Sequence, residues 1–153
     1  MPNFRPNVAA IIINKKGEVL VCERKKDRGA WQFPQGGVDA GESKLEALER
    51  EIMEEVGIPA DDYKVMESKD GYSYFYPSYL MNKKKKRKWD GQEQTYFLCV
   101  LKKKAKGPDL GKNNPEFRDF EWVRPEDFEV SWLPDFKLKV YRKVMEDFFD
   151  IKI

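Results

Sequence analysis

The feature that most constrains the fold of this chain is an amphipathic segment from Ser43 to Val56, which follows a glycine-rich stretch. Its apolar residues recur at helical spacing, and Gly57 stands where a helix commonly ends. At about 100° per residue, four apolar side chains share one face: Leu45, Leu48, Ile52 and Val56. The pattern predicts a helix over residues 43–56 whose apolar face packs on a β-sheet.

Short β-branched and aromatic runs predict the strands of that sheet. They are expected at residues 8–13, 19–22, 31–33, 63–68, 72–80, 96–101 and 120–123, with a second amphipathic helix at 136–149. Mixed strands around one central and one C-terminal helix predict an α/β sandwich. A length of 153 residues predicts a single domain, residues 1–153.

Three glutamates lie beside the apolar face of the first helix. Glu51, Glu54 and Glu55 stand at i, i+3 and i+4, so their carboxylates gather within an arc of roughly 100°. Like charges at this spacing repel, and the macrodipole disfavours anions near a helix C-terminus. A divalent cation would offset both penalties, and oxygen-only ligands favour Mg²⁺ or Mn²⁺. Taken alone, the residues also fit a solvated acidic face with Lys44 and Arg50 nearby.

The composition excludes several kinds of chemistry. The chain has no histidine, so Ser-His-Asp catalysis and histidine-ligated zinc are excluded. Cys22 and Cys99 both lie in apolar runs, and we expect two free, buried thiols. Basic and acidic residues number 29 and 27, so a uniformly basic nucleic-acid coat is also excluded. Without an apolar leader or a long apolar span, the chain is expected to be cytoplasmic, away from membranes.

The residues around the acidic helix carry a longer pattern. Residues 36–58 read GGVDAGESKLEALEREIMEEVGI. This matches at every position the Nudix box G-x5-E-x7-R-E-U-x-E-E-x-G-U, in which U is apolar. The chain therefore resembles Nudix hydrolases, which cleave a nucleoside diphosphate linked to another group. The resemblance implies the Nudix fold, an α/β/α sandwich in which the box forms a loop, a helix and a second loop.

The resemblance also implies a metal site of two or more ions, Mg²⁺ or its substitute Mn²⁺. Its ligands would be Glu51, Glu54 and Glu55, with the backbone carbonyl of Gly36 or Gly37. Glu116, outside the box, would supply a fourth carboxylate. Glu51 is the first candidate for the general base, with Glu54 and Glu116 as alternatives.

A supporting ion pair is implied by the same resemblance. Glu42 and Arg50 would orient the glycine-rich loop on the helix without touching the reacting atoms.

Segments outside the box resemble one subgroup, the bacterial RNA pyrophosphohydrolases together with dinucleoside polyphosphate hydrolases. They are residues 5–8, 31–37, 89–98, 115–123 and 136–144. The implied substrate-binding residues are Arg5, Arg24, Lys25, Gln35, Tyr74, Gln92, Phe136 and Lys137. Arg5 would contact phosphates and Phe136 would stack on a base. Arg24 or Lys25 would cover the other side of that base by a cation–π contact.

The function implied is removal of pyrophosphate from 5′-triphosphorylated RNA, and the alternative is hydrolysis of dinucleoside polyphosphates. DNA is not an expected partner. A silent nucleotide sensor is disfavoured because all the box acids are present. The run Lys83–Lys88 departs from the subgroup. Six like charges are typical of a solvated loop, but near the phosphate end they would favour a long polyanion as substrate. The lysines of residues 102–106 are expected to form a solvated loop.

Overall fold

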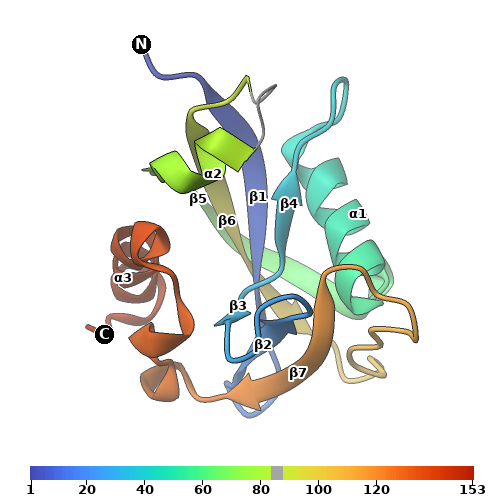
Figure 1. Cartoon of the computed structure of the whole chain (residues 1–153). Coiled ribbons are helices and arrows are strands. Elements are labelled where there is room, and N and C mark those ends of the chain that lie inside the picture. The colour runs from blue at the N-terminus through green and yellow to red at the C-terminus, as the bar shows by residue number, and fades with distance from the viewer. Residues whose placement is uncertain (84–87) are drawn as a thin grey trace.

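The computed structural model describes residues 1–83 and 88–153, so most of the basic run at residues 83–88 lies outside the described residues. The elements are β1 (Phe4–Ile13), β2 (Val19–Arg24), β3 (Trp31–Gln32), β4 (Gln35–Gly37), α1 (Lys44–Val56), β5 (Tyr63–Phe75), α2 (Ser78–Lys83), β6 (Gly91–Leu101), β7 (Phe117–Val123) and α3 (Asp135–Phe149). Figure 1 shows these elements in chain order. Within the described ranges, no helix is long and apolar enough to span a membrane.

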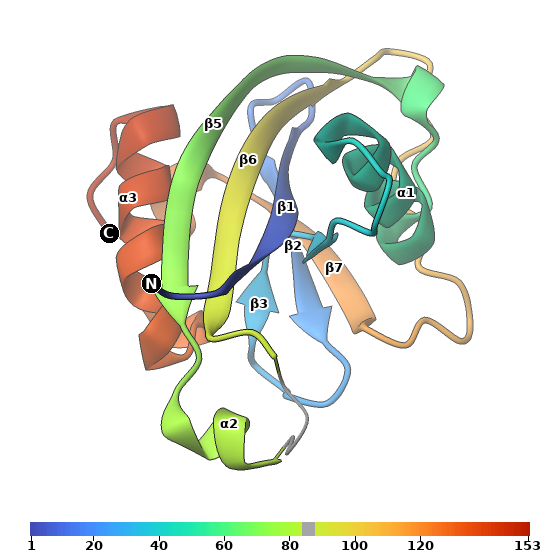
Figure 2. The same ribbon diagram turned by 90° about the horizontal axis from the view of Figure 1, so that it is seen from above.

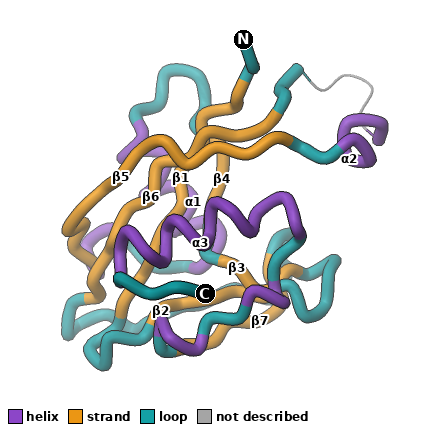
Figure 3. The backbone as a smooth tube through the Cα atoms, turned by 90° about the vertical axis from the view of Figure 1, so that its left-hand side faces the viewer, coloured by secondary structure: helices purple, strands orange, loops and turns teal. Residues whose placement is uncertain are grey.

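A mixed β-sheet lies between two helices. Figure 2 shows α1 on one side of the sheet and α3 on the other, and in Figure 3 α3 lies across the face turned to the viewer. This three-layer arrangement confirms the predicted α/β/α sandwich. It places the acidic helix and the C-terminal helix on opposite faces of the same strands.

Strand β1 organises the sheet. It runs parallel to β6, which pairs antiparallel with β5. It pairs with β2 only where Ile13 faces Val19, because β2 then turns away to pair with β3 and β7. Strand β4 fills the space left beside β1, with residues 35–37 opposite residues 7–9. The glycine-rich loop is therefore fixed to the central strand by a backbone ladder.

The side chains of β1 supply both hydrophobic cores. Val8, Ala10 and Ile12 belong to the core under α1. Ala9 and Ile11 belong to the core under α3. Alternate side chains of a strand point to opposite faces, so a strand apolar at consecutive positions needs cover on both sides.

Helix α1 follows its sequence signals closely. The Ser43 hydroxyl accepts from the backbone N–H of Glu46, whose carboxylate accepts from the N–H of Ser43, so the N-terminus carries a capping box. Gly57 ends the helix in the left-handed conformation. The prediction for Leu45 is wrong, because this side chain is 47% exposed in the open first turn, and Ala47 is buried instead.

The predicted break within residues 63–80 is also wrong. Strand β5 continues from Tyr63 to Phe75 through two register shifts, one of them at residues 69–72, where Gly71 has a positive φ. Residues 78–83, expected to lie partly in a strand, form helix α2 after Pro77. A proline lacks the N–H that would extend the ladder, which explains why pairing stops before it.

Both cysteines are free and buried, as predicted. Burial raises the pKa of the Cys99 thiol to about 12, and burial together with the nearby carboxylates raises the pKa of Cys22 further. Both remain protonated, unreactive core residues.

A pair of glycine substitutions tests the loop after α1. Gly57 and Gly41 have φ of 68° and 80°, where a side chain costs about 1–2 kcal/mol. At Gly57 an added Cβ would also overlap the carbonyl oxygen of Asp109, whose N–H bonds to Val56. No atom lies within 4 Å of the corresponding point at Gly41. Gly57→Ala should therefore lower the free energy of unfolding by about 1–3 kcal/mol more than Gly41→Ala in urea denaturation. Equal losses would contradict this packing.

Candidate active site

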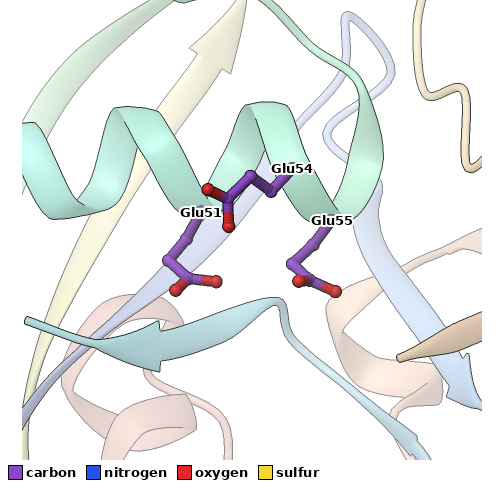
Figure 4. A group of neighbouring side chains, drawn as sticks. All are labelled: Glu51, Glu54 and Glu55. Atoms are coloured by element: carbon purple, nitrogen blue, oxygen red, sulfur yellow. The ribbon is translucent and has the colours of Figure 1, made fainter. Parts of the chain in front are cut away.

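The three box glutamates on α1 form one cluster. One carboxylate oxygen from each of Glu51, Glu54 and Glu55 lies within 4.8 Å of the others. Figure 4 shows the side chains on one side of the helix, with Glu51 and Glu55 extending together toward β4. The i, i+3, i+4 spacing therefore places three carboxylates close enough together to share one metal ion.

Burial makes this cluster electrostatically costly. Glu55 is only 8% exposed, and its Oε2 atom has no hydrogen-bond partner within the described chain. Burial, followed by repulsion from Glu116, Glu51 and Glu54, raises the pKa of Glu55 to about 7. Burial also raises the pKa of Glu51, against the opposing effect of Arg50.

Arg50 is the counter-charge of the cluster. Its Nε and Nη2 donate to the two carboxylate oxygens of Glu42 at 2.6 and 2.9 Å, and its Nη1 donates to Glu51 at 2.8 Å. Nη2 also donates to the carbonyl of Gly37 at 2.9 Å. One guanidinium thus joins the loop, the helix and a cluster carboxylate, using a planar donor set that lysine lacks.

Two glycines let charged groups approach β4. A Cβ at Gly36 would overlap the Glu51 carboxylate, and a Cβ at Gly37 would overlap the Arg5 guanidinium. The absence of side chains lets an anion and a cation lie against adjacent residues of one short strand. Because the Gly37 carbonyl already accepts from Arg50, Gly36 is the better candidate for the predicted carbonyl ligand.

Glu116 reaches the cluster from the loop before β7. The buried Asn114 accepts from the N–H of Glu116 at 2.9 Å and donates to the Glu55 carbonyl at 2.7 Å. Lys25 supports the same loop, since its ammonium donates to the Asn114 carbonyl at 3.1 Å and its N–H to the Glu116 carbonyl at 2.8 Å. Asn114 was not predicted as a site residue, although Asn before Pro115 is a turn signal.

Two adjoining cavities surround these groups. The first, about 250 Å³, is the carboxylate cavity, lined by Arg5, Asn7, Gln35, Gly36, Gly37, Glu51, Glu55, Gln92 and Glu116. The second, about 480 Å³, is the aromatic cavity, lined by Arg5, Arg24, Asp27, Gln35, Tyr74, Tyr76, Tyr79, Leu80, Gln92, Glu116, Pro134, Phe136 and Lys137. The two share Arg5, Gln35, Gln92 and Glu116, so they are halves of one site.

Aromatic rings and cations define the second half. The Phe136 and Tyr74 rings lie 5.4 Å apart, and the Tyr74 hydroxyl donates to the Gln92 side chain. Arg24 lines the same cavity. Burial and the charge of Arg24 lower the pKa of Lys137 to about 8. A cation with so little solvent favours an anionic ligand.

Gln35 lies at the junction of the two cavities. Its side-chain oxygen is buried without a hydrogen-bond partner among the residues described. Buried polar atoms are normally paired, so a lone acceptor facing a cavity fits a site completed by a ligand.

Most of the predicted site residues line the two cavities, and three others stand beside them: Glu54 in the carboxylate cluster, and the bonded pair Glu42 and Arg50. Lys25 does not line either cavity, because its ammonium is held by the loop that carries Glu116. Sequence reasoning missed Tyr76, which follows the end of β5, and Tyr79, which lies on α2. Both residues line the aromatic cavity. Their signal was hidden because residues 72–80 were expected to form one strand.

The donor set fits a hard divalent cation. The ligands on offer are carboxylate oxygens, and one of them, on Glu55, is buried and unpaired within the described chain. Mg²⁺ and Mn²⁺ prefer such oxygen ligands. Glu51, Glu54 and Glu55 would hold the ion, and its positive charge would offset the repulsion among the three carboxylates.

Comparison with known proteins agrees with this geometry. The NUDIX domain profile matches residues 3–148, nearly the whole chain. The chain therefore belongs to the Nudix family, as the box at residues 36–58 predicted.

Individual relatives point to one subgroup of this family. The RNA pyrophosphohydrolases of Helicobacter pylori and of a Nitratiruptor species are each 42% identical to this chain, over 95% of it and 93% of their own length. That of Shewanella piezotolerans is 41% identical, over 95% of this chain and 84% of its own. Among solved structures, a C. elegans Ap4A hydrolase superposes with a TM-score of 0.65 at 20% identity, covering 95% of this chain and 99% of that one. At that identity the likeness shows the fold alone.

Glu55→Gln should lower turnover while raising the thermal stability of the metal-free protein. Removing a charged ligand should lower kcat by on the order of 10²-fold or more. Because the folded pKa of Glu55, about 7, exceeds its ordinary 4.5, the stability it contributes is full below pH 4.5 and is lost as pH rises through 7. With EDTA at pH 8, Glu55→Gln should therefore melt at a higher temperature than the wild type, and this gain should shrink at pH 4.5.

Glu54→Gln is the matched control. Its side chain is 54% exposed, so its loss should lower kcat while leaving the melting temperature in EDTA nearly unchanged. Normal turnover of folded Glu55→Gln at saturating Mg²⁺ would disprove the metal assignment.

Arg50→Ala should reduce both activity and acid-sensitive stability. Hydrogen bonding to Arg50 lowers the pKa of Glu42 from 4.5 to about 2, so the stability that Glu42 contributes is present above pH 4.5 and lost as pH falls through 2. The variant should melt at a lower temperature at pH 7 and lose less between pH 4.5 and 2 than the wild type does. Arg50→Lys keeps the charge but cannot donate to Glu42, Gly37 and Glu51 together, so it should recover only part of the loss. Unchanged melting and turnover in Arg50→Ala would contradict this role.

Proposed function

We propose that this chain is a metal-dependent RNA pyrophosphohydrolase, which releases pyrophosphate from 5′-triphosphorylated RNA and leaves a 5′-monophosphate. The observation that carries the proposal is the joining of the carboxylate cavity to the aromatic cavity through four shared residues. A terminal triphosphate fits the first, and the bases that follow fit the second. The RNA pyrophosphohydrolases at 41–42% identity support the same assignment.

The carboxylate cavity would carry the reaction. Glu51, Glu54 and Glu55, with the Gly36 carbonyl and Glu116, would hold two or more Mg²⁺ ions, with Mn²⁺ as a substitute. Bound divalent metal neutralises phosphate charge and acidifies a water molecule. Glu51 is our first candidate to accept the proton of that water, because it lies against β4 in the cavity, and Glu54 and Glu116 are the alternatives.

The aromatic cavity would read the 5′-terminal nucleotides. Arg5, which lines both cavities, would contact phosphate oxygens, and Phe136 would stack on a base with Arg24 on its other side. Tyr74, Gln92 and Gln35 supply polar groups near that base, and Lys137 a cation. Lys25 would act indirectly, by holding the loop of Glu116.

We further propose a single catalytic domain acting in the cytoplasm on RNA destined for decay. The two free, buried thiols fit a reducing compartment. Hydrolysis of dinucleoside polyphosphates is the second candidate function. An aromatic cavity of this kind would also accept the nucleoside of such a substrate.

The two functions are separated by comparing kcat/KM on 5′-triphosphorylated RNA and on diadenosine tetraphosphate at equal Mg²⁺. The RNA should be preferred by at least about tenfold. Phe136→Ala should raise KM for RNA by roughly tenfold, since a base–aromatic stack contributes about 1–3 kcal/mol. Phe149→Ala, also half-buried but at the other end of α3, is the control and should leave KM unchanged. A preference for the dinucleotide would favour the second candidate.

A further inference from the structure

A third cavity, lined mainly by lysines, lies away from the carboxylates. It has a volume of about 370 Å³ and opens between the β1–β2 turn, the loop after β6 and strand β7. Its lining includes Lys15, Lys16, Lys102, Lys103, Lys106 and Trp122, and we name it the basic groove. The loop expected to be merely solvated thus forms one wall of a concave surface.

The positive charge of the basic groove is only partly neutralised locally. Among the residues described, none of its five lysine ammonium groups forms an ion pair. Glu18 is the one acidic residue of the lining, and its carboxylate accepts from the Asn14 side chain, so five ammonium groups stand against a single negative charge. A chain with a net charge of only +2 therefore concentrates free positive charge at one place.

Trp122 gives the groove an aromatic wall. The indole is partly buried against the core under α1, and Trp122 also lines the groove. Lysines around an aromatic face suit single-stranded nucleic acid, because cations contact the phosphates while a base stacks on the ring. A surface for an acidic peptide would need the lysines but not the ring.

The groove lies within reach of a substrate held in the active site. The β1–β2 turn and the loop after β6, which line the groove, lie at the end of β1 far from the N-terminus (Figure 1), and Trp122 packs on the core under α1. Arg5 and Asn14 are about nine positions apart, which amounts to about 30 Å of strand at ~3.3 Å per residue. A stacked strand rising ~3.4 Å per nucleotide would cover this distance in about nine nucleotides. Because residues 7–12 of β1 are buried, the RNA has to pass around the sheet and needs more than this number.

We propose that the basic groove binds the RNA chain downstream of the 5′ end whose triphosphate occupies the carboxylate cavity. This inference rests on the proposed function, and it adds a second, sequence-independent contact to the same substrate. Two contacts on one chain raise its affinity through effective concentration, without involving the reacting atoms. The groove therefore affects KM for long RNA and leaves kcat unchanged.

The test uses 5′-triphosphorylated RNAs of about 3 and about 20 nucleotides that share their first three nucleotides. For the wild type, KM should be at least roughly tenfold lower for the longer RNA. In Lys16→Gln/Lys103→Gln/Lys106→Gln this difference should disappear, with kcat and the KM of the short RNA unchanged. Lys64→Gln/Lys139→Gln/Lys152→Gln removes the same charge from lysines outside the groove, and it should behave as the wild type does.

Direct binding separates this inference from the proposed function. An oligouridylate of about 20 nucleotides with a 5′-hydroxyl end should bind the wild type, and the groove variant should lose about two units of log–log salt slope, at ~0.7 per phosphate contact. Equal binding by both proteins would overturn the inference, as would a variant that loses affinity for polyglutamate but not for RNA. Failure of the wild type to release pyrophosphate from the short RNA would instead overturn the proposed function.

Discussion

The mutual repulsion of four carboxylates is the constraint on which the rest of this structure depends. Glu51, Glu54 and Glu55 converge from α1, and Glu116 adds a fourth charge from another loop. Burial of Glu55, followed by repulsion from Glu116, Glu51 and Glu54, raises its pKa to about 7. In the metal-free protein Arg50 offsets only part of this cost, since its closest bonds go to Glu42 and Glu51. The fold therefore gives up stability at a site that a divalent cation would complete.

The architecture around this cluster follows from holding it in place. Strand β2 diverges from β1, which leaves room for β4, and β4 brings Gly36 and Gly37 beneath the helix. Arg50 then joins the loop to the helix, and Asn114 joins the loop of Glu116 to the end of α1. Each connection uses a backbone carbonyl as well as a side chain. The carboxylates are thus positioned by the ladder of the sheet and not only by their own rotamers.

Sequence reasoning succeeded where the determinants are local. The capping box, the terminal glycine and the i, i+3, i+4 glutamates all act within a few turns of one helix, and α1 forms as they predict. It failed where tertiary contacts decide. Leu45 fits the apolar stripe by angle but has too few neighbours at the helix end, and β5 continues through residues that read as a break. Lys25 is drawn to the Asn114 carbonyl, a partner 89 positions away in the chain. The proximity of Glu116 to Glu55 depends on Asn114, and no spacing rule could have revealed that bridge.

The near-neutral total charge results from acidic and basic groups that lie in different parts of the fold. Acidic groups concentrate at one end of β1, where a cation and a triphosphate would neutralise one another, and lysines without ion pairs in the described chain line the groove at the other end. A uniformly basic surface would attract RNA in any orientation and would compete with the metal for phosphate oxygens. Separating the charges along one strand would instead orient a polyanion, because its densest charge would be drawn to the metal and its backbone to the lysines. Because the stiff ladder between β1 and β6 connects the two ends, the spacing between them is fixed by the sheet itself.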